Sequence, residues 1–245
     1  MISKKAISFE IRAPVMSFRK PRYENYQISY SIPPKTMIAG MIANAYNHGE
    51  KFFYELLKDF QYGVVTLDIK GKFKDLWRAI QGNPAAKKDP SKKWNIFSRE
   101  KLFYPHYRIY IRSGKYMENI QEALRNPQNI VYLGLSEELV EIINVQEIVM
   151  EPELTDLVDT IIPLNWMDKL LDMEWRSSLE SLKALFPLQV ESIVEDYKVE
   201  FKGMTRTKRE PEKSVELLVI CGGRFKLKEK IEAYKGLEGD HIIFV

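Results

Sequence analysis

The sequence is poor in the residues that build disulfides and metal sites: its 245 residues include one cysteine, Cys221, and three histidines. A single cysteine excludes an intrachain disulfide, and so few thiols and imidazoles argue against a structural zinc site. No apolar run approaches the ~20 residues that a helix needs to cross a bilayer, and residues 1–6 lack the apolar core of a signal peptide. We therefore expect a cytoplasmic protein with no membrane contact, no metal and no cofactor.

The net charge of +3 is also small, but the charges are unevenly distributed. Residues 1–136 carry 23 Lys and Arg against 11 Asp and Glu, whereas residues 137–200 carry 4 against 16. Such an asymmetry is typical of a protein with one side toward a polyanion and an acidic part that faces elsewhere. Blocks of charge can also mix on folding, so the count alone leaves both interpretations open.

Hydrophobic periodicity predicts an α+β protein. The expected elements are strand 6–12, helices 37–47 and 51–60, strands 63–70 and 103–112, helix 115–125 and strand 138–150. Their order is that of a ferredoxin-like (RRM-like) fold, which we place at residues 1–152. Residues 153–245 are predicted to form a smaller β-rich domain, with short helices at 165–171 and 179–185, strands at 190–201 and 214–220, and a basic turn at 204–213.

The first helix has a distinctive approach, Ser29-Tyr30-Ser31-Ile32-Pro33-Pro34-Lys35-Thr36. The two prolines favour an extended chain and suit a helix start, where an amide donor is not needed. We expect Thr36 to cap this helix and Gly49 to end it in a left-handed conformation. The helix start would then lie beside the basic loop that precedes it.

That loop combines cations with aromatic rings, since Phe18, Arg19, Lys20, Arg22 and Tyr23 fall within six positions. Cations reach phosphates, and rings stack on unpaired bases for about 1–3 kcal/mol each. The loop is therefore a candidate RNA contact. The alternative is an ordinary solvated loop with Phe18 in the core.

A second basic segment lies at residues 82–101, where Gly82, Pro84 and Pro90 interrupt regular structure. Its cations surround Trp94 and are Lys87, Lys88, Lys92, Lys93, Arg99 and Lys101. The pattern predicts a flexible basic finger that leaves the sheet after a strand at 72–81. A solvated lysine-rich loop is the alternative.

The strand at 103–112 has one face of mixed aromatic and cationic character, formed by Tyr104, His106, Arg108, Tyr110 and Arg112. Such a face is typical of the stacking platforms that bind single-stranded RNA, although Tyr and Arg also line contacts between domains. Near the end of the chain, Gly222 and Gly223 before Arg224 could let backbone amides approach a phosphate. A plain Gly-Gly hairpin is the alternative there.

Several stretches together resemble the Cas-five family of CRISPR-associated proteins, of the RAMP superfamily. They are residues 7–12, Ser17-Phe18-Arg19, the Ser29–Thr36 approach with Gly40, and Tyr132-Leu133-Gly134-Leu135-Ser136-Glu137. The resemblance spans about the first 150 residues, and the C-terminal part matches only through the glycine pair. It implies a ferredoxin-like domain with a hairpin "thumb", to which residues 82–101 are similar in position.

The resemblance also implies a function. Family members are usually non-catalytic subunits of the type I surveillance complex called Cascade, where they hold the five-prime handle of the guide RNA and cap the backbone filament. The partners would be CRISPR RNA, the backbone subunit and the large subunit. The predicted RNA-binding residues are Phe18, Arg19, Lys20, Arg22, Tyr23, Tyr30, Lys35, Thr36, Lys87, Lys88, Lys92, Lys93, Trp94, Arg99, Arg108, Arg112, Gly222, Gly223 and Arg224.

One branch of the family instead cuts precursor RNA without a metal, which requires a base or cation near a ribose 2′-hydroxyl. Tyr46 falls where that branch resembles this chain, and His48 is two residues further on. The adjacent lysine–histidine pair of that branch is missing, and Lys101 and His106 are five residues apart. The alternative function is therefore a metal-independent endoribonuclease that uses Tyr46, His48, Lys101 and His106.

Overall fold

The computed structural model describes residues 5–19, 26–27, 29–80, 94–134, 138–175, 188–202 and 206–245. Within these ranges the side chains of some residues, among them Arg19 and Trp94, are not described. No helix in these ranges is long and apolar enough to cross a membrane.

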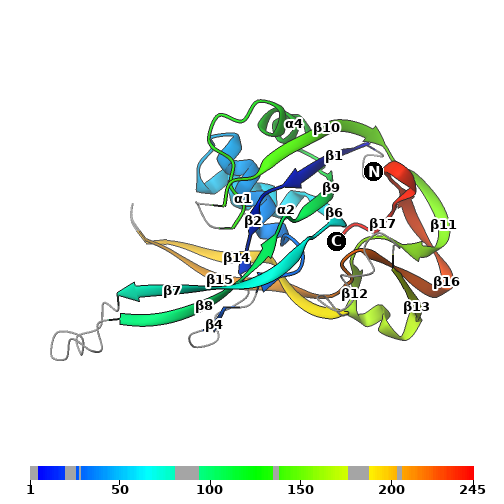
Figure 1. Cartoon of the computed structure of the whole chain (residues 1–245). Coiled ribbons are helices and arrows are strands. Elements are labelled where there is room, and N and C mark those ends of the chain that lie inside the picture. Colours follow the sequence, from blue (N-terminus) through cyan, green and yellow to red (C-terminus); the bar gives the residue numbers. More distant parts are fainter. Residues whose placement is uncertain are drawn as a thin grey trace.

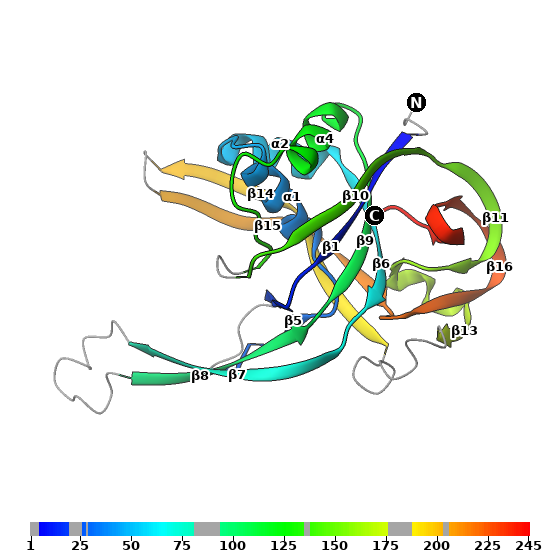
Figure 2. The same cartoon turned by 45° about the horizontal axis from the view of Figure 1, so that its top comes forward.

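The centre of the molecule is a four-stranded antiparallel sheet in the order β10-β1-β9-β6. Its strands are β1 (Lys5–Arg12), β6 (Gln61–Asp68), β9 (His106–Arg112) and β10 (Glu141–Val149). Helices α1 (Lys35–Ala45) and α2 (Glu50–Asp59) follow β1, and α4 (Met117–Arg125) follows β9. This is the predicted ferredoxin-like arrangement. The three helices lie together on one side of the sheet (Figures 1 and 2).

The start and end of α1 differ from the prediction. The carbonyl of Pro34 accepts hydrogen bonds from the amides of Met37 and Ile38, so Pro34 is the N-cap and Thr36 is already inside the helix. The left-handed residue after the helix is Asn47, with φ of 57°, because asparagine tolerates this conformation. Gly49 has a φ of −68° and begins α2 instead.

The predicted finger is a long hairpin, which we call the thumb. It consists of β7 (Gly71–Ile80) and β8 (Trp94–Phe103), so it begins about ten residues before the predicted range of 82–101. On its other edge β8 pairs with two short strands of the N-terminal loop, β2 (Val15–Met16) and β4 (Tyr26–Gln27). The same loop contains a small antiparallel pair, β3 (Phe18–Arg19) and β5 (Ser29–Tyr30). Loop and thumb are thus joined by backbone hydrogen bonds.

The rest of the chain forms two further sheets. One contains β11 (Glu151–Val158), β13 (Leu170–Trp175), β16 (Gly223–Lys235) and β17 (His241–Ile242), and the other contains β12 (Ile162–Pro163), β14 (Gln189–Lys202) and β15 (Arg206–Val219). The described residues of this part also include the short 3-10 helices η2 (Leu164–Lys169) and η4 (Leu237–Gly239). Strand pairing changes from the first sheet to the second at Met150.

The C-terminal prediction was correct for the strand near 190–201 and wrong for the basic turn. Residues 206–213 belong to β15, which pairs with β14 in a second long hairpin. The expected helix at 165–171 is η2 followed by β13, and the one at 179–185 lies outside the described residues. Leu217, Val219 and Cys221 share one apolar core with the helices and β1, so the β14–β15 hairpin is packed against the helical layer.

Candidate RNA-binding surface

The loop from Ser17 to Ser31 is fixed at its first end by a buried carboxylate. Glu138 accepts hydrogen bonds from the amide of Ser17 (2.9 Å) and from its hydroxyl (2.8 and 3.0 Å), and it also pairs with Lys101 of the thumb (3.5 Å). Both Ser17 and Glu138 are buried. A buried carboxylate with such partners is costly to disturb, so this end of the loop is held firmly against the thumb.

Gly134, in the Tyr132-Leu133-Gly134 motif, makes this contact possible. Its φ of 103° is a conformation that favours glycine, and a Cβ there would lie 2.5 Å from the carbonyl oxygen of Ser17 and 2.6 Å from Glu138. Only a residue without a side chain lets the loop and Glu138 meet at this point. The motif therefore serves the anchor of the loop.

The second end of the loop is fixed in the same way by Glu191 of β14. Its carboxylate accepts hydrogen bonds from the amide (2.9 Å) and hydroxyl (2.8 Å) of Ser31. The carbonyl of Ser31 accepts two more, from the buried hydroxyl of Tyr107 (2.7 Å) and from the thiol of Cys221 (3.6 Å). The serines of the sequence motif are thus the two points at which distant parts of the chain hold the basic loop.

Of the three aromatic residues of this loop that are predicted to bind RNA, the structure corrects Phe18 and Tyr30. Phe18 is fully buried and packs on Tyr107, with ring centroids 5.8 Å apart. Tyr30 is 9% exposed and donates its hydroxyl to the carbonyl of Ser192 (2.9 Å). Burial first, and then the charge of Glu191, raise the pKa of Tyr30 to about 12. Their rings hold the loop in place and cannot stack on a base.

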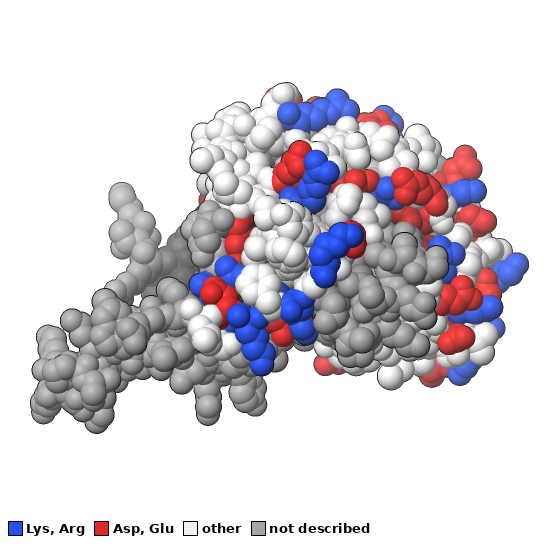
Figure 3. Space-filling view, viewed as in Figure 1, with Lys and Arg blue, Asp and Glu red and all other residues white. Residues whose placement is uncertain are grey.

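The structure does not test most of the predicted cations of the loop and of residues 87–93. The backbone of Arg19 is in β3, but Lys20, Arg22 and Tyr23 lie outside the described residues. So do Lys87, Lys88, Lys92 and Lys93, and Trp94 begins β8 without a described side chain. Arg99 is 9% exposed and pairs across the hairpin with Asp75 (3.4 Å), so it strengthens the thumb instead of offering a charge. Figure 3 shows Lys and Arg beside a few Asp and Glu at the root of the thumb, and both charges are also mixed over the C-terminal sheets.

The predicted platform on β9 is covered by the protein itself. Arg108 is 4% exposed and binds Glu10 (2.9 Å) and Asp240 (3.1 Å), and the buried hydroxyl of Tyr110 also donates to Asp240 (2.8 Å). Asp240 belongs to the segment 236–245, which lies over this face of the sheet. The RNA-platform prediction for Arg108 and Tyr110 is therefore wrong, because residues of the same chain cover them.

Glu10 is the acidic centre of this buried network. Burial alone would raise the pKa of Glu10, but its hydrogen bonds with Arg108 and His106 outweigh that effect and hold the pKa below its ordinary value. The carboxylate is therefore charged at neutral pH and balances Arg108.

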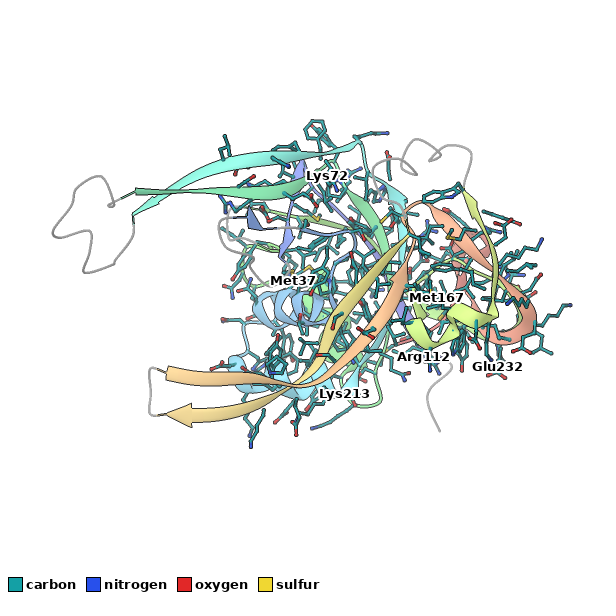
Figure 4. All side chains as sticks on the ribbon, turned by 90° about the horizontal axis from the view of Figure 1, so that it is seen from below. Met37, Lys72, Arg112, Met167, Lys213 and Glu232 are labelled. Atoms are coloured by element: carbon teal, nitrogen blue, oxygen red, sulfur yellow. The ribbon has the colours of Figure 1, made fainter. Side chains whose placement is uncertain are left out.

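Two other predicted cations, Lys35 and Arg112, are buried but line one pocket. Lys35 lies over the ring of Phe60 and Arg112 over those of Tyr234 and Phe244. The pocket has a volume of about 450 Å³, and Lys58 and Lys213 contribute to its wall. Figure 4 labels Arg112 and Lys213 on the side seen from below, near the β14–β15 hairpin. Thr36, partly exposed, lines a separate groove of about 630 Å³ with Tyr197.

The glycine pair near the end of the chain does not face solvent. Gly222 and Gly223 are buried at the turn into β16, and a Cβ on Gly223 would lie 2.8 Å from the carbonyl of Glu174. Arg224 is bound to the fully buried carboxylate of Asp159 (2.9 Å). The prediction of a phosphate contact at Gly222 and Gly223 is wrong, and Arg224 is already paired.

The four residues of the nuclease alternative do not come together as one site. Tyr46 and His48 stack with ring centroids 4.3 Å apart, and the hydroxyl of Tyr46 accepts a hydrogen bond from Asn119 (2.7 Å). Lys101 pairs with Asp75 (3.6 Å) and Glu138, whereas His106 contacts Glu10 (2.9 Å). Among the described residues, Lys101 and His106 therefore have different partners, and neither shares one with Tyr46 or His48.

Sequence reasoning missed the two anchoring glutamates and the exposed rings of Phe73 and Phe103 beside Tyr104. Glu138 and Glu191 looked like members of an acidic surface block, although the serines that they bind had been singled out. Phe73, Phe103 and Tyr104 at the root of the thumb are 40%, 43% and 52% exposed. The alternation of β7 could have indicated Phe73, because its neighbours in the strand are lysines.

The ferredoxin-like sheet with its thumb is the arrangement that the resemblance to CRISPR-associated proteins implied. The sequence model described as "CRISPR-associated protein (Cas_Cas5)" matches residues 6–205. Because this covers most of the chain, the protein belongs to that family, Cas5. No curated protein matches the sequence closely.

Solved structures agree on the fold. A chain of a structure titled "CRISPR RNA-guided surveillance complex" has a TM-score of 0.54 at 17% identity, over 92% of this chain and 91% of that chain. A CRISPR protein from Archaeoglobus fulgidus has a TM-score of 0.54 at 13% identity, over 97% and 98% of the two chains. At such identities the likeness shows the fold and does not show the function.

Proposed function

We propose that this protein is a non-catalytic, CRISPR RNA-binding subunit of a type I surveillance complex. It holds the five-prime handle of the guide RNA and caps the backbone filament. The observation that carries the proposal is one small sheet. In it, β2 and β4 of the basic loop pair with one edge of β8 and β7 pairs with the other edge, so the loop and the thumb are joined.

This sheet brings the two most basic stretches of the sequence into one structural unit. In the sequence Arg19, Lys20 and Arg22 fall between two strands that pair with β8, and the lysines of residues 87–93 fall between β7 and β8. The anchors at Ser17 and Ser31 keep the loop ends in fixed positions, which lowers the entropy cost of binding. A fixed base and a long arm suit a strand of RNA that must be bent.

The covered sheet face supports the same location. The aromatic and cationic face of β9 is occupied by residues 236–245, so RNA cannot stack there without displacing them. The RNA then has to run along the loop and thumb, and the pocket of Lys35 and Arg112 offers one further phosphate contact. The backbone subunit would meet the thumb, and the large subunit would meet the more acidic C-terminal part.

The test is a salt titration of RNA binding. Replacing Arg19, Lys20 and Arg22 with Ala should weaken binding of repeat-derived single-stranded RNA and lower the slope of log K against log salt by about two, because three phosphate contacts are lost. A matched control removes three exposed cations elsewhere, Lys5, Lys51 and Arg125. Equal effects in both variants would mean that only the total charge matters and would remove the loop from the site.

The non-catalytic part of the proposal has a separate test. The purified protein is incubated with labelled repeat RNA in EDTA, beside the Tyr46→Phe variant, and products are separated on a denaturing gel. We expect the RNA to remain intact with both proteins. Cleavage at one position that is lost in Tyr46→Phe would establish the endoribonuclease function instead.

A further inference from the structure

The turn between the thumb and β9 presents an aromatic ring in an unusual backbone conformation. Tyr104 has a φ of 47°, the left-handed region that non-glycine residues seldom adopt. The residue is 52% exposed, and its ring meets the ring of Phe103 edge-on, with centroids 4.6 Å apart; Phe103 in turn meets Phe73. Three exposed aromatic rings therefore follow one another at the root of the thumb.

The backbone around Tyr104 is pinned on three sides. The carbonyl of Phe103 accepts a hydrogen bond from the amide of Lys70 (2.9 Å), and the amide of Tyr104 donates to the carbonyl of Pro14 (2.9 Å). The carbonyl of Pro105 accepts one from Ala13 (3.4 Å). Strained conformations persist where neighbours enforce them, and they gather at functional sites. Here the strain holds a large ring toward solvent.

Tyr104 also forms a wall of a pocket of about 580 Å³ at one end of the central sheet. Pro14, Pro105 and Leu139 give it further apolar walls. Its charged side chains are paired with each other: Arg12 with Glu141 (2.6 Å) and Lys70 with Asp68 (2.5 Å). The pocket is thus close to neutral, apolar on its walls and rich in hydrogen-bonding groups at its rim.

We infer that this pocket binds one base of a single-stranded RNA, stacked on Tyr104. The inference rests on the proposed RNA-binding function and adds a base site that is distinct from the phosphate contacts of the loop. A paired, neutral rim does not attract a phosphate, whereas donors and acceptors beside an aromatic wall fit the edge and the face of a base. The pocket lies where RNA would pass from the loop to the thumb.

The test uses the full-length protein and short single-stranded RNAs that each carry 2-aminopurine at one position, whose fluorescence falls on stacking. One position should be quenched by the wild type and by Tyr104→Phe. In Tyr104→Leu the quenching should disappear and the Kd should rise by about 5- to 150-fold. Leucine keeps the apolar bulk and the backbone strain, so this change removes the aromatic face alone. Leu171→Ala, at an exposed apolar side chain of β13, should change neither quantity.

Tyr104→Gly provides a readout that a structural role would not give. Glycine adopts this φ without strain, so this variant should melt no lower than the wild type while binding RNA as weakly as Tyr104→Leu. A marked fall in Tm would mean that the ring holds the fold together and would overturn the inference.

The outcomes separate this inference from the proposed function. If the loop variant weakens RNA binding and Tyr104→Leu does not, the base site is wrong and the RNA-binding function stands. If the wild type binds no RNA, both are wrong. If Tyr104→Leu binds RNA normally but Tyr104→Gly fails to assemble with the other subunits, the pocket takes an apolar side chain of a partner protein, which also overturns the base site.

Discussion

The buried face of β9 and the exposed root of the thumb have similar residue types and opposite exposure. Arg108 and Tyr110 on β9 are 4% and 0% exposed, whereas Phe103 and Tyr104 a few residues earlier are 43% and 52% exposed. Both surfaces combine rings with cations, and in the sequence they form one alternating pattern. Residue types alone therefore do not identify an RNA surface.

The position of the carboxylates distinguishes the two surfaces. Glu10 stands opposite Arg108 on the neighbouring strand, and Asp240 comes from a segment 132 residues further along the chain. Together they neutralise the cation and allow it to be covered. At the root of the thumb the carboxylates pair with cations beside the rings and leave the rings open. An alternating pattern of rings and cations predicts a contact surface. Whether the protein covers that surface itself depends on carboxylates from distant parts of the sequence.

The largest effect should come from a substitution in the buried network around Arg108. Arg108→Ala leaves Glu10 and Asp240 buried without their cation, which costs about 3–5 kcal/mol of unfolding free energy for such pairs. Urea denaturation measures it, with Lys5→Ala as a control because its pair with Glu147 is exposed. A loss no larger than that of the control would contradict the view that this network holds the C-terminal segment.

A smaller loss is expected at the anchor of the basic loop. Ser31→Ala removes the hydroxyl that donates a hydrogen bond to Glu191. We expect the unfolding free energy to fall by about 1–3 kcal/mol, because a buried carboxylate loses a donor. RNA binding should weaken as well, since the loop end is no longer fixed. Ser192→Ala, at an exposed position next to Glu191, should leave stability and binding unchanged. Unaltered stability of Ser31→Ala would show that the anchor is dispensable.

The network around Glu10 also predicts a dependence on pH. Because the folded-state pKa of Glu10 is lowered, its stabilising effect is complete above the unfolded value of about 4.3. It is lost as pH falls through the lower folded value. Melting curves of wild type and Glu10→Gln should therefore differ most at neutral pH and approach each other in acid. A difference in Tm between the two proteins that stays the same at every pH would mean that protonation of Glu10 is not coupled to folding.

The smallest effect concerns Cys221, which touches the anchor at Ser31. Burial, as the main cause, raises the pKa of its thiol to about 12. We expect almost no alkylation by iodoacetamide at pH 8 in the native wild type, and faster labelling in Ser31→Ala, followed by mass spectrometry. Rapid labelling of the wild type would show that the layer over the anchor opens readily.

The central elements could be predicted from the sequence because each one has its own periodic pattern. Strand β1, the helices and β9 follow from local apolar spacing, and the sheet order follows from their sequence. The β14–β15 hairpin could not be recognised in full, because Pro211 and its basic neighbours resemble a turn, and a register shift near Tyr197 accommodates them. Local pattern does not reveal such compensation.

The candidate site was predicted less completely for a related reason. The serine motif and the basic loop were found, but the partners Glu138 and Glu191 lie more than 100 residues away from their serines. Whether Phe18 points inward also depends on Tyr107, a residue of another strand. Contacts of this kind become visible only when the strands are assembled.

The cover over β9 has a consequence for the making of the protein. Residues 236–245 follow every strand of the central sheet in the sequence, so Arg108, Tyr110 and Arg112 lack this cover until that segment is made. A protein cut after Lys235 should bind RNA less selectively than the full-length chain in filter-binding assays. The sheet is thus shielded by a segment that lies far from β9 in the sequence.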